Sequence, residues 1–223
     1  MKRVSMCLLA LAGLVGLCAV TATELTASAP AQAAMPGMPN MPGMGNMPGM
    51  AKPVKSSVGQ HLLPWNKVSK LVAQDDTMGK VDKAKKMVTF TGKHIHLVFV
   101  AVEPGFPDTT FEVHRLVDPA VRVPAGSKVT LTLVNMDYGP GMIHGIAIGK
   151  KSPPYAGVIS LPLPQQLGSL ALLLPRTGLH IKKSKYWTST VTFTCRKPGT
   201  YYYLCQMPAH AKTGMYGRFI VQK

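Results

Sequence analysis

From Val81 to the end of the chain, hydrophobic and polar positions form short runs with turn residues between them. Runs rich in β-branched and aromatic residues occupy positions 87–91, 94–102, 110–116, 121–123, 128–135, 145–148, 191–194, 199–205 and 218–221. Short strands separated by turns are typical of a β-sandwich or a β-barrel. We therefore predict an all-β body for this part of the chain.

A helical pattern precedes the predicted strands, within residues 61–80. Val68, Leu71 and Val72 recur at positions i, i+3 and i+4, so they would share one face of a helix, and Gly79 would close it. We predict a helix that packs on the flank of the β-body as a structural cover. Residues 156–185 are a long connection rich in Leu and Pro.

The first 33 residues have the pattern of a secretory signal peptide. A basic start, Met1 to Arg3, is followed by apolar residues 4–20 and by the sequence Ala-Gln-Ala at 31–33. We expect cleavage before Ala34 and a periplasmic protein. The alternative is an uncleaved anchor, because an apolar run of about 17 residues is near the lower limit for crossing a membrane.

Residues 34–60 are predicted to be a disordered linker, and residues 61–223 a single domain. Met recurs every third residue from 35 to 50, between Pro, Gly and Asn, and these neighbours prevent regular helix or strand. Clustered thioethers are soft donors that suit Cu(I), so a copper-capturing role is the alternative to a plain linker.

The chain is strongly basic, with 25 Lys and Arg against 9 Asp and Glu and a formal charge of +16. The basic residues are scattered along the sequence, which does not favour binding to nucleic acid. Acid denaturation largely reflects protonation of carboxylates that are paired in the folded state. A chain with few carboxylates therefore suits an acidic periplasm, although a basic protein at neutral pH is an alternative.

Candidate metal ligands follow the tyrosine-rich strand 199–205. Cys205, His210 and Met215 are spaced five residues apart on one short loop, which leads into the closing strand 218–221. One Cys and two His in a plane, with a weak axial Met, form the blue-copper electron-transfer site. The loop would supply three of these four donors, so one His must come from elsewhere.

His144 is the best candidate for the fourth donor. It follows the strand 128–135 and the loop 136–143, which can approach the loop of Cys205 at one end of a sandwich. For the remaining histidines, a solvated or hydrogen-bonded role is expected; these are His61, His94, His96, His114 and His180. Cys195 is expected to be a small buried side chain, because a metal-bound Cys205 cannot also form a disulfide.

The copper loop resembles that of the rusticyanins, a family of cupredoxins from acidophilic iron oxidisers. The resemblance rests on YYYLCQMPAHAKTGMYG at 201–217, with EPGFP at 103–107, FEVH at 111–114, VPAG at 123–126 and KKSPPY at 150–155. It covers about residues 61–223 and implies a Greek-key β-sandwich with an N-terminal helical extension. It also implies one type 1 copper ion, cycling between Cu(I) and Cu(II), with the ligands His144, Cys205, His210 and Met215. The loop before His144 is about two residues longer than in the family, and Asp137 stands where an Asn is expected.

The resemblance further implies a role in electron transfer. The chain would carry single electrons in a respiratory chain at acidic pH, with ferrous iron as the upstream donor. We expect a monomer whose redox partners, such as a c-type cytochrome or a terminal oxidase, dock near His210. A copper chaperone or sensor that uses the Met-rich run is the alternative. An enzyme is not favoured, because the sequence has no His-Cys-His cluster for a trinuclear copper centre and no pair of Cys spaced for a binuclear one.

Overall fold

A computed structural model describes residues 59–159, 161 and 166–223. The predicted signal peptide and the Met-rich run lie outside these described residues. Among the helices that the structure describes, none is long and apolar enough to cross a membrane.

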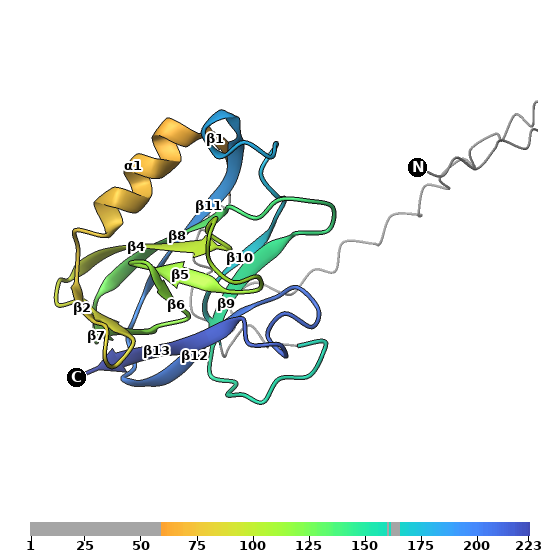
Figure 1. Cartoon of the computed structure of the whole chain (residues 1–223). Helices are drawn as coiled ribbons and strands as arrows, with labels where there is room; N and C mark the ends of the chain where they lie inside the picture. Colours follow the sequence, from red (N-terminus) through yellow and green to blue (C-terminus); the bar gives the residue numbers. More distant parts are fainter. Residues whose placement is uncertain (1–58, 160, 162–165) are drawn as a thin grey trace, which may run out of the picture. The chain divides into compact units, whose positions relative to one another are not determined.

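Two mixed β-sheets form the body of the domain (Figure 1). The six-stranded sheet has the order β1-β11-β8-β4-β5-β6, and the seven-stranded sheet has the order β10-β9-β12-β13-β7-β3-β2. The strand bounds are β1 (Gln60–Pro64), β2 (Lys80–Asp82), β3 (Met87–Thr89), β4 (His94–Ala101), β5 (Phe111–Val113), β6 (Leu116–Val117), β7 (Ala120–Pro124), β8 (Lys128–Asn135), β9 (His144–Gly149), β10 (Gln166–Leu173), β11 (Lys185–Thr194), β12 (Gly199–Cys205) and β13 (Tyr216–Gln222). The predicted all-β sandwich is confirmed.

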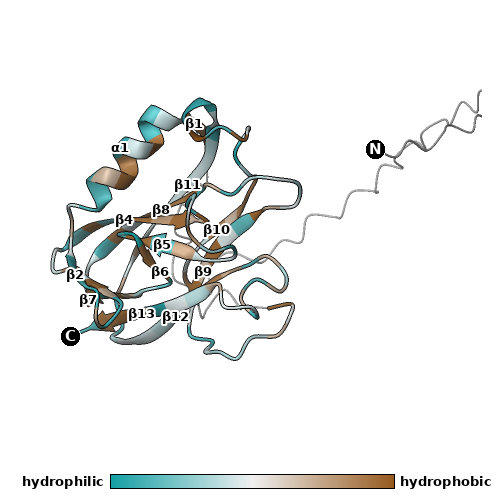
Figure 2. Cartoon of the chain, in the orientation of Figure 1, coloured by the Kyte–Doolittle hydropathy of each residue, from teal (hydrophilic) through white to brown (hydrophobic). Residues whose placement is uncertain are grey.

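The core lies between the two sheets, where alternate residues of each strand meet. Phe99 of β4 and Tyr203 of β12 are fully buried, and their ring centroids lie 4.7 Å apart in an edge-to-face arrangement. The Tyr203 hydroxyl donates a hydrogen bond to the carbonyl of Pro119, so its polar atom is satisfied inside the core. Figure 2 shows hydrophobic residues along the strands of both sheets.

Helix α1 (Trp65–Asp75) covers the outer face of the six-stranded sheet. Val68 of the helix is fully buried, and it belongs to a second apolar cluster with Val98 and Val100 of β4 and Tyr186 of β11. These two valines alternate with the β4 residues that face the main core, so the strand is buried on both sides. The predicted cover helix is confirmed, although it is shorter than the predicted pattern.

Residues 61–64, predicted to begin the helix, instead form the strand β1 along the edge of β11, with His61 opposite Thr188. Pro64 then serves as the N-cap of α1, where its missing N–H costs no hydrogen bond. Three residues before a proline are too few to reveal helical periodicity, and the edge pairing is a long-range contact. The helical prediction was therefore wrong for these residues.

Two further strand predictions are corrected. The single strand predicted over 110–116 is interrupted after β5, because His114 and Arg115 both adopt positive φ angles, 51° and 58°, and turn the chain into β6. Within the predicted connection 156–185, residues 166–173 form β10, which pairs with β9 at the edge of the seven-stranded sheet.

Candidate metal centre

The sheet topology brings the metal-ligand candidates to one end of the sandwich. β9 begins at His144 and β12 ends at Cys205, and these strands are antiparallel neighbours in which Cys205 pairs with Ile146. The loop from Gln206 to Met215 joins β12 to β13 and carries His210. His144 therefore comes close to the loop although it lies more than 60 residues earlier in the sequence.

Three donor atoms converge in this region. Nδ1 of His144 lies 3.8 Å from Sγ of Cys205, and Nδ1 of His210 lies 3.7 Å from the same sulfur. The donor atoms of the three residues all lie within 4.8 Å of one another, and within the described ranges no other group of three or more such residues has this arrangement. Cys205 and His144 are fully buried, whereas His210 is only partly buried.

Backbone hydrogen bonds hold the loop in shape. The amide of Cys205 donates to the carbonyl of Met215 at 3.0 Å, and the amide of Met215 donates to the carbonyl of His210 at 3.0 Å. The amide of Gln206 bonds across to the carbonyl of Gly145, which ties the loop to β9. Met215 is fully buried and packs in the main core beside Cys205. The structure thus brings all four predicted ligands to one end of the fold.

The ring of His144 is oriented by a carboxylate. Nε2 of His144 lies 2.8 Å from Oδ2 of Asp137, and an ionised carboxylate can only accept, so Nε2 carries the proton and donates it. Nδ1 of His144 then presents its lone pair toward Cys205. A carboxylate on the second nitrogen of a metal-binding histidine is a common way of fixing the tautomer and raising ligand basicity.

Asp137 is itself held in place by the backbone. Its amide donates to Oδ1 of Asn135, and its Oδ1 accepts from the amide of Tyr138 at 2.7 Å. The sequence showed that Asp137 departs from the family pattern, but it did not reveal the contact with His144.

Asn135 is a supporting residue that the sequence analysis missed. Its Nδ2 lies within hydrogen-bonding distance of the carbonyls of Met142, Leu173 and Leu174. It therefore connects the loop before His144 to the end of β10. Its position as the last residue of a strand, directly before the ligand loop, is the one sequence signal that could have indicated this role.

Burial sets the protonation of the site. Burial raises the pKa of the Cys205 thiol, and a bound cation would offset this effect by favouring the thiolate. Burial, and then the nearby ring of His144, lowers the pKa of His210. Because protons compete with metals for imidazole nitrogen, the lowered pKa keeps His210 available for a metal at more acidic pH.

The other histidines do not join this group. His61, His94, His96 and His180 are exposed, as expected. His114 differs from the expectation, because it is buried and neither ring nitrogen makes a hydrogen bond; its Nε2 lies 3.4 Å from Oδ2 of Asp75. The positive φ at this position turns the side chain inward, which a strand prediction could not indicate.

Cys195 is a fully buried free thiol, as expected, and so is Cys205; the structure has no disulfide between them. Burial raises the pKa of the Cys195 thiol to about 11. Among the described residues, Cys195 does not belong to the group of donors formed by His144, Cys205 and His210.

The β-sandwich and its donor set define a blue copper protein of the cupredoxin class, and a thiolate, two imidazoles and a thioether fit one copper ion. No model of a protein family matches the chain. Over 153 residues the chain is 40% identical to the rusticyanin of Acidithiobacillus ferridurans, covering 69% of this chain and 75% of that protein. The chain belongs to the rusticyanin family.

Solved structures agree with this assignment. The structure of reduced rusticyanin has a TM-score of 0.64 and 35% identity, and the match covers 74% of this chain and all of that chain. A rusticyanin structure from Thiobacillus ferrooxidans has the same TM-score with 34% identity, covering 74% and 99% of the two chains. The rusticyanin of Acidithiobacillus ferrooxidans is 39% identical over 69% of this chain and 90% of its own length. The protein is thus a type 1 copper protein of electron transport.

Proposed function

We propose that His144, Cys205, His210 and Met215 bind one copper ion, and that the protein shuttles single electrons in a periplasmic respiratory chain at acidic pH. Ferrous iron would be the upstream source of these electrons. The observation that carries the proposal is the convergence of two Nδ1 atoms on the sulfur of Cys205, at 3.8 and 3.7 Å. The iron-dependent chain and the compartment are proposed from family membership and from the basic, carboxylate-poor sequence.

The bound copper would supply a one-electron couple, and the protein would supply a rigid set of donors. The loop is closed by backbone bonds from Cys205 to Met215 and from Met215 to His210, and Asp137 fixes the ring of His144. Donors held in this way move little when the charge of the site changes, so little reorganisation accompanies each electron. The buried thioether of Met215 favours the less charged state and a high potential.

We further propose that the protein is a carrier and not an enzyme, since four protein donors would occupy the coordination positions that substrate chemistry requires. Deeply buried donors also release metal slowly, which disfavours the role of a copper chaperone.

The route for electrons would pass through His210. Cys205, His144 and Met215 are fully buried, whereas the ring of His210 is partly exposed, so it is the ligand that a partner can approach. Exposed apolar side chains gather on the neighbouring loop and at the end of β10; they are Tyr138, Met142, Leu172 and Leu174. Small apolar patches suit transient redox encounters, here with a c-type cytochrome or a terminal oxidase.

The decisive experiment is rapid mixing of the copper(II)-loaded protein with ferrous sulfate at acidic pH. We expect the thiolate-to-copper absorption band to bleach as the protein takes one electron, and to return after addition of an oxidant. A Cys205→Ser variant should have no such band, while Cys195→Ser, the matched control, should behave as wild type. A wild-type protein that binds copper but is not reduced by ferrous iron would overturn the iron-linked part of the proposal.

A further inference from the structure

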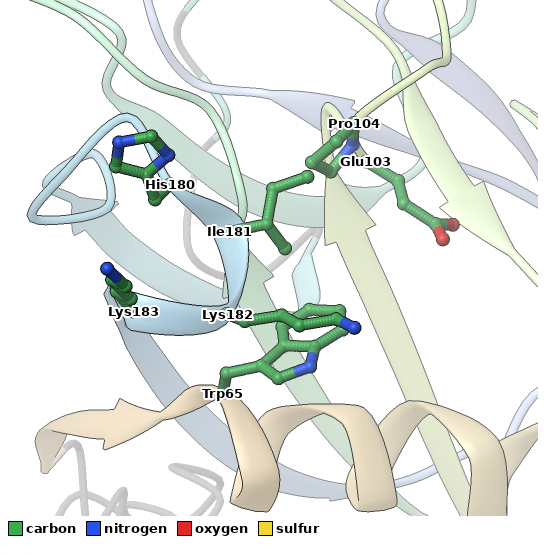
Figure 3. Close-up of a pocket in the computed structure, with 7 residues that line it drawn as sticks. All are labelled: Trp65, Glu103, Pro104, His180, Ile181, Lys182 and Lys183. Carbon is green, nitrogen blue, oxygen red and sulfur yellow. The ribbon is translucent and has the colours of Figure 1, made fainter.

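A second concave feature lies outside the metal centre. A cavity of about 530 Å³ opens beside the start of α1, with an apolar floor made by Trp65, Pro104 and Ile181. Figure 3 shows Trp65 at the start of α1 and the side chain of Ile181 directed toward Pro104. We name this cavity the Trp65 hollow.

The Trp65 hollow lies at the same end of the six-stranded sheet as the metal centre. β4 and β8 are parallel, with Ala101 opposite Asn135, so Pro104 follows β4 at the end where the loop before His144 begins. β11 is antiparallel to β8, and its first residue, Lys185, pairs with Pro64 just before Trp65.

Arg176 connects the two regions directly. Its amide donates to the carbonyl of Asp137, and its guanidinium donates to the carbonyls of Met136, Gly178 and Leu179. One side chain therefore joins the loop before His144 to the turn that borders the Trp65 hollow.

The rim of the Trp65 hollow is positively charged. His180, Lys182 and Lys183 are exposed at its edge, on the turn that contains the 3₁₀ helix η2 (Ile181–Lys183). The one carboxylate that lines it, Glu103, already accepts a hydrogen bond from Arg115 at 3.1 Å. From Tyr138 to Lys223 the sequence contains eleven Lys and Arg residues and no Asp or Glu. An acidic ligand would therefore meet no repulsion from carboxylate side chains in this part of the chain.

The basic turn is fixed before any ligand arrives. Ser184 donates through its hydroxyl to the carbonyls of Gly178 and His180, at 2.7 and 2.8 Å. The hydroxyl of the buried Tyr186 donates to the carbonyl of Ile181 at 2.8 Å. A binding surface that is already ordered loses little conformational entropy on association.

We propose that the Trp65 hollow anchors an acidic segment of the protein's redox partner. Carboxylates of the partner would pair with Lys182 and Lys183, and an apolar side chain beside them would enter the cavity against Trp65 and Ile181. A free inorganic anion would use the charges but leave the apolar floor unused. The inference rests on the proposed electron-transfer function, and it adds a charged contact to the apolar patch near His210. Charge complementarity of this kind increases the association rate and makes it dependent on salt.

The experiment uses the copper(II)-loaded full chain and the reduced soluble domain of cytochrome b5 as an acidic redox probe. We compare the Lys182→Glu/Lys183→Glu variant with Arg196→Glu/Lys197→Glu, which changes the charge equally. Arg196 and Lys197 are exposed and follow β11 at its opposite end, where Thr194 pairs with Lys128. At low ionic strength the first variant should react with the cytochrome about tenfold more slowly than wild type. The rate of the control variant should fall by less than about twofold. The difference should disappear at high salt.

An Ile181→Ser variant tests the apolar floor, because it preserves both lysines. It should slow the reaction without changing the salt dependence. The visible absorption and midpoint potential of each variant should equal those of wild type, which separates a docking effect from damage to the metal centre.

Equal slowing of both charge variants, or slowing of neither, would overturn the proposal. A third result would also overturn it: Lys182→Glu/Lys183→Glu reacts with cytochrome b5 as wild type does but no longer binds phosphatidylserine-containing vesicles. The surface would then be assigned to a membrane. If wild type forms no blue copper site, the proposed function itself fails.

Discussion

The carboxylate of Asp137 lies 2.8 Å from Nε2 of His144, on the opposite side of the imidazole from Cys205. His144 is fully buried and Asp137 nearly so, so solvent does little to screen the interaction between them. A negative charge beside a metal-binding imidazole increases its electron donation and favours the more positive state of the metal. In the proposed copper site, Asp137 would therefore oppose the rise in potential that the buried thioether of Met215 would cause.

Replacing this carboxylate with an amide tests its electrostatic role. Asp137→Asn retains an oxygen that can accept the hydrogen bond of His144 but removes the negative charge. We expect the midpoint potential to rise by tens of millivolts, where about 59 mV corresponds to a tenfold change for a one-electron couple. Redox titration of the visible band measures this shift. Asp82→Asn, at a half-exposed carboxylate of β2 that pairs with Lys85, should leave the potential unchanged. A potential that falls or stays constant in Asp137→Asn would contradict the assigned role.

Three carboxyl groups, those of Asp75 and Glu112, which are buried, and that of Asp118, which is half-buried, predict greater stability in acid than at neutral pH. Burial raises the pKa of Asp75 and of Asp118 to about 7 and that of Glu112 to about 8, from ordinary values of 3.8 and 4.5. The folded state thus favours their protonated forms. Their contribution to the free energy of unfolding is fully present below the pKa values of the unfolded state, and it is lost as the pH rises through 7 to 8. His114 acts in the opposite direction, because burial lowers its pKa and its contribution is lost as the pH falls.

Urea unfolding of the copper-free protein across the acidic and neutral range measures this dependence without competition from metal binding. The three carboxyl groups outnumber the two histidines whose pKa is lowered, His114 and His210, so we expect the free energy of unfolding to fall between about pH 5 and about pH 8. Glu112→Gln should flatten the profile, whereas Asp108→Asn, at an exposed position, should not. A free energy of unfolding that rises toward neutral pH would contradict the stabilising role of these protonated carboxyl groups.

The close approach of β13 to Tyr203 predicts a sensitive glycine. A Cβ atom on Gly217 would overlap the phenol ring of Tyr203, which is fully buried and bonded to the carbonyl of Pro119. The ring cannot move without disturbing the core, so Gly217→Ala should cost about 1–3 kcal/mol of stability. Gly157→Ala is the matched control, since nothing lies within 4 Å of its added Cβ. Equal unfolding midpoints for the two variants would show that the core can adjust around residue 217.

Asn135 provides a test of how the ligand loop is supported. Asn135→Ala would remove the donor shared by the carbonyls of Met142, Leu173 and Leu174. A buried acceptor without a partner lowers the free energy of unfolding by about 1–3 kcal/mol. The variant should therefore be clearly less stable than wild type. The loop before His144 should also loosen, which hydrogen exchange of residues 136–143 would report. Thr190→Ala, which removes a half-buried hydroxyl pair with Thr132, should leave that exchange unchanged.

The sequence predicted the parts of the protein that depend on local patterns. The strand Lys128–Asn135 has the predicted bounds, because its alternation of apolar residues is long and uninterrupted. Cys205, His210 and Met215 could be recognised because they lie on one loop. His144 was indicated by the argument that strand-end loops meet at one end of a sandwich, together with the resemblance to the rusticyanins.

Features that depend on distant contacts could not be predicted. β1 and β10 are edge strands whose identity comes from pairing with β11 and β9, and their own residues give no clear alternation. The burial of His114 follows from a positive φ that no local pattern indicates. The contact of Asp137 with His144 and the assembly of the Trp65 hollow likewise depend on tertiary structure.

The most direct test of the metal centre is the electron paramagnetic resonance spectrum of the protein loaded with one equivalent of Cu(II). If Cys205, His144 and His210 bind the ion together with Met215, the spectrum should show the narrow parallel hyperfine splitting of a thiolate-bound type 1 site. A wide splitting typical of copper bound only by nitrogen and oxygen, unchanged by Cys205→Ser, would contradict the account.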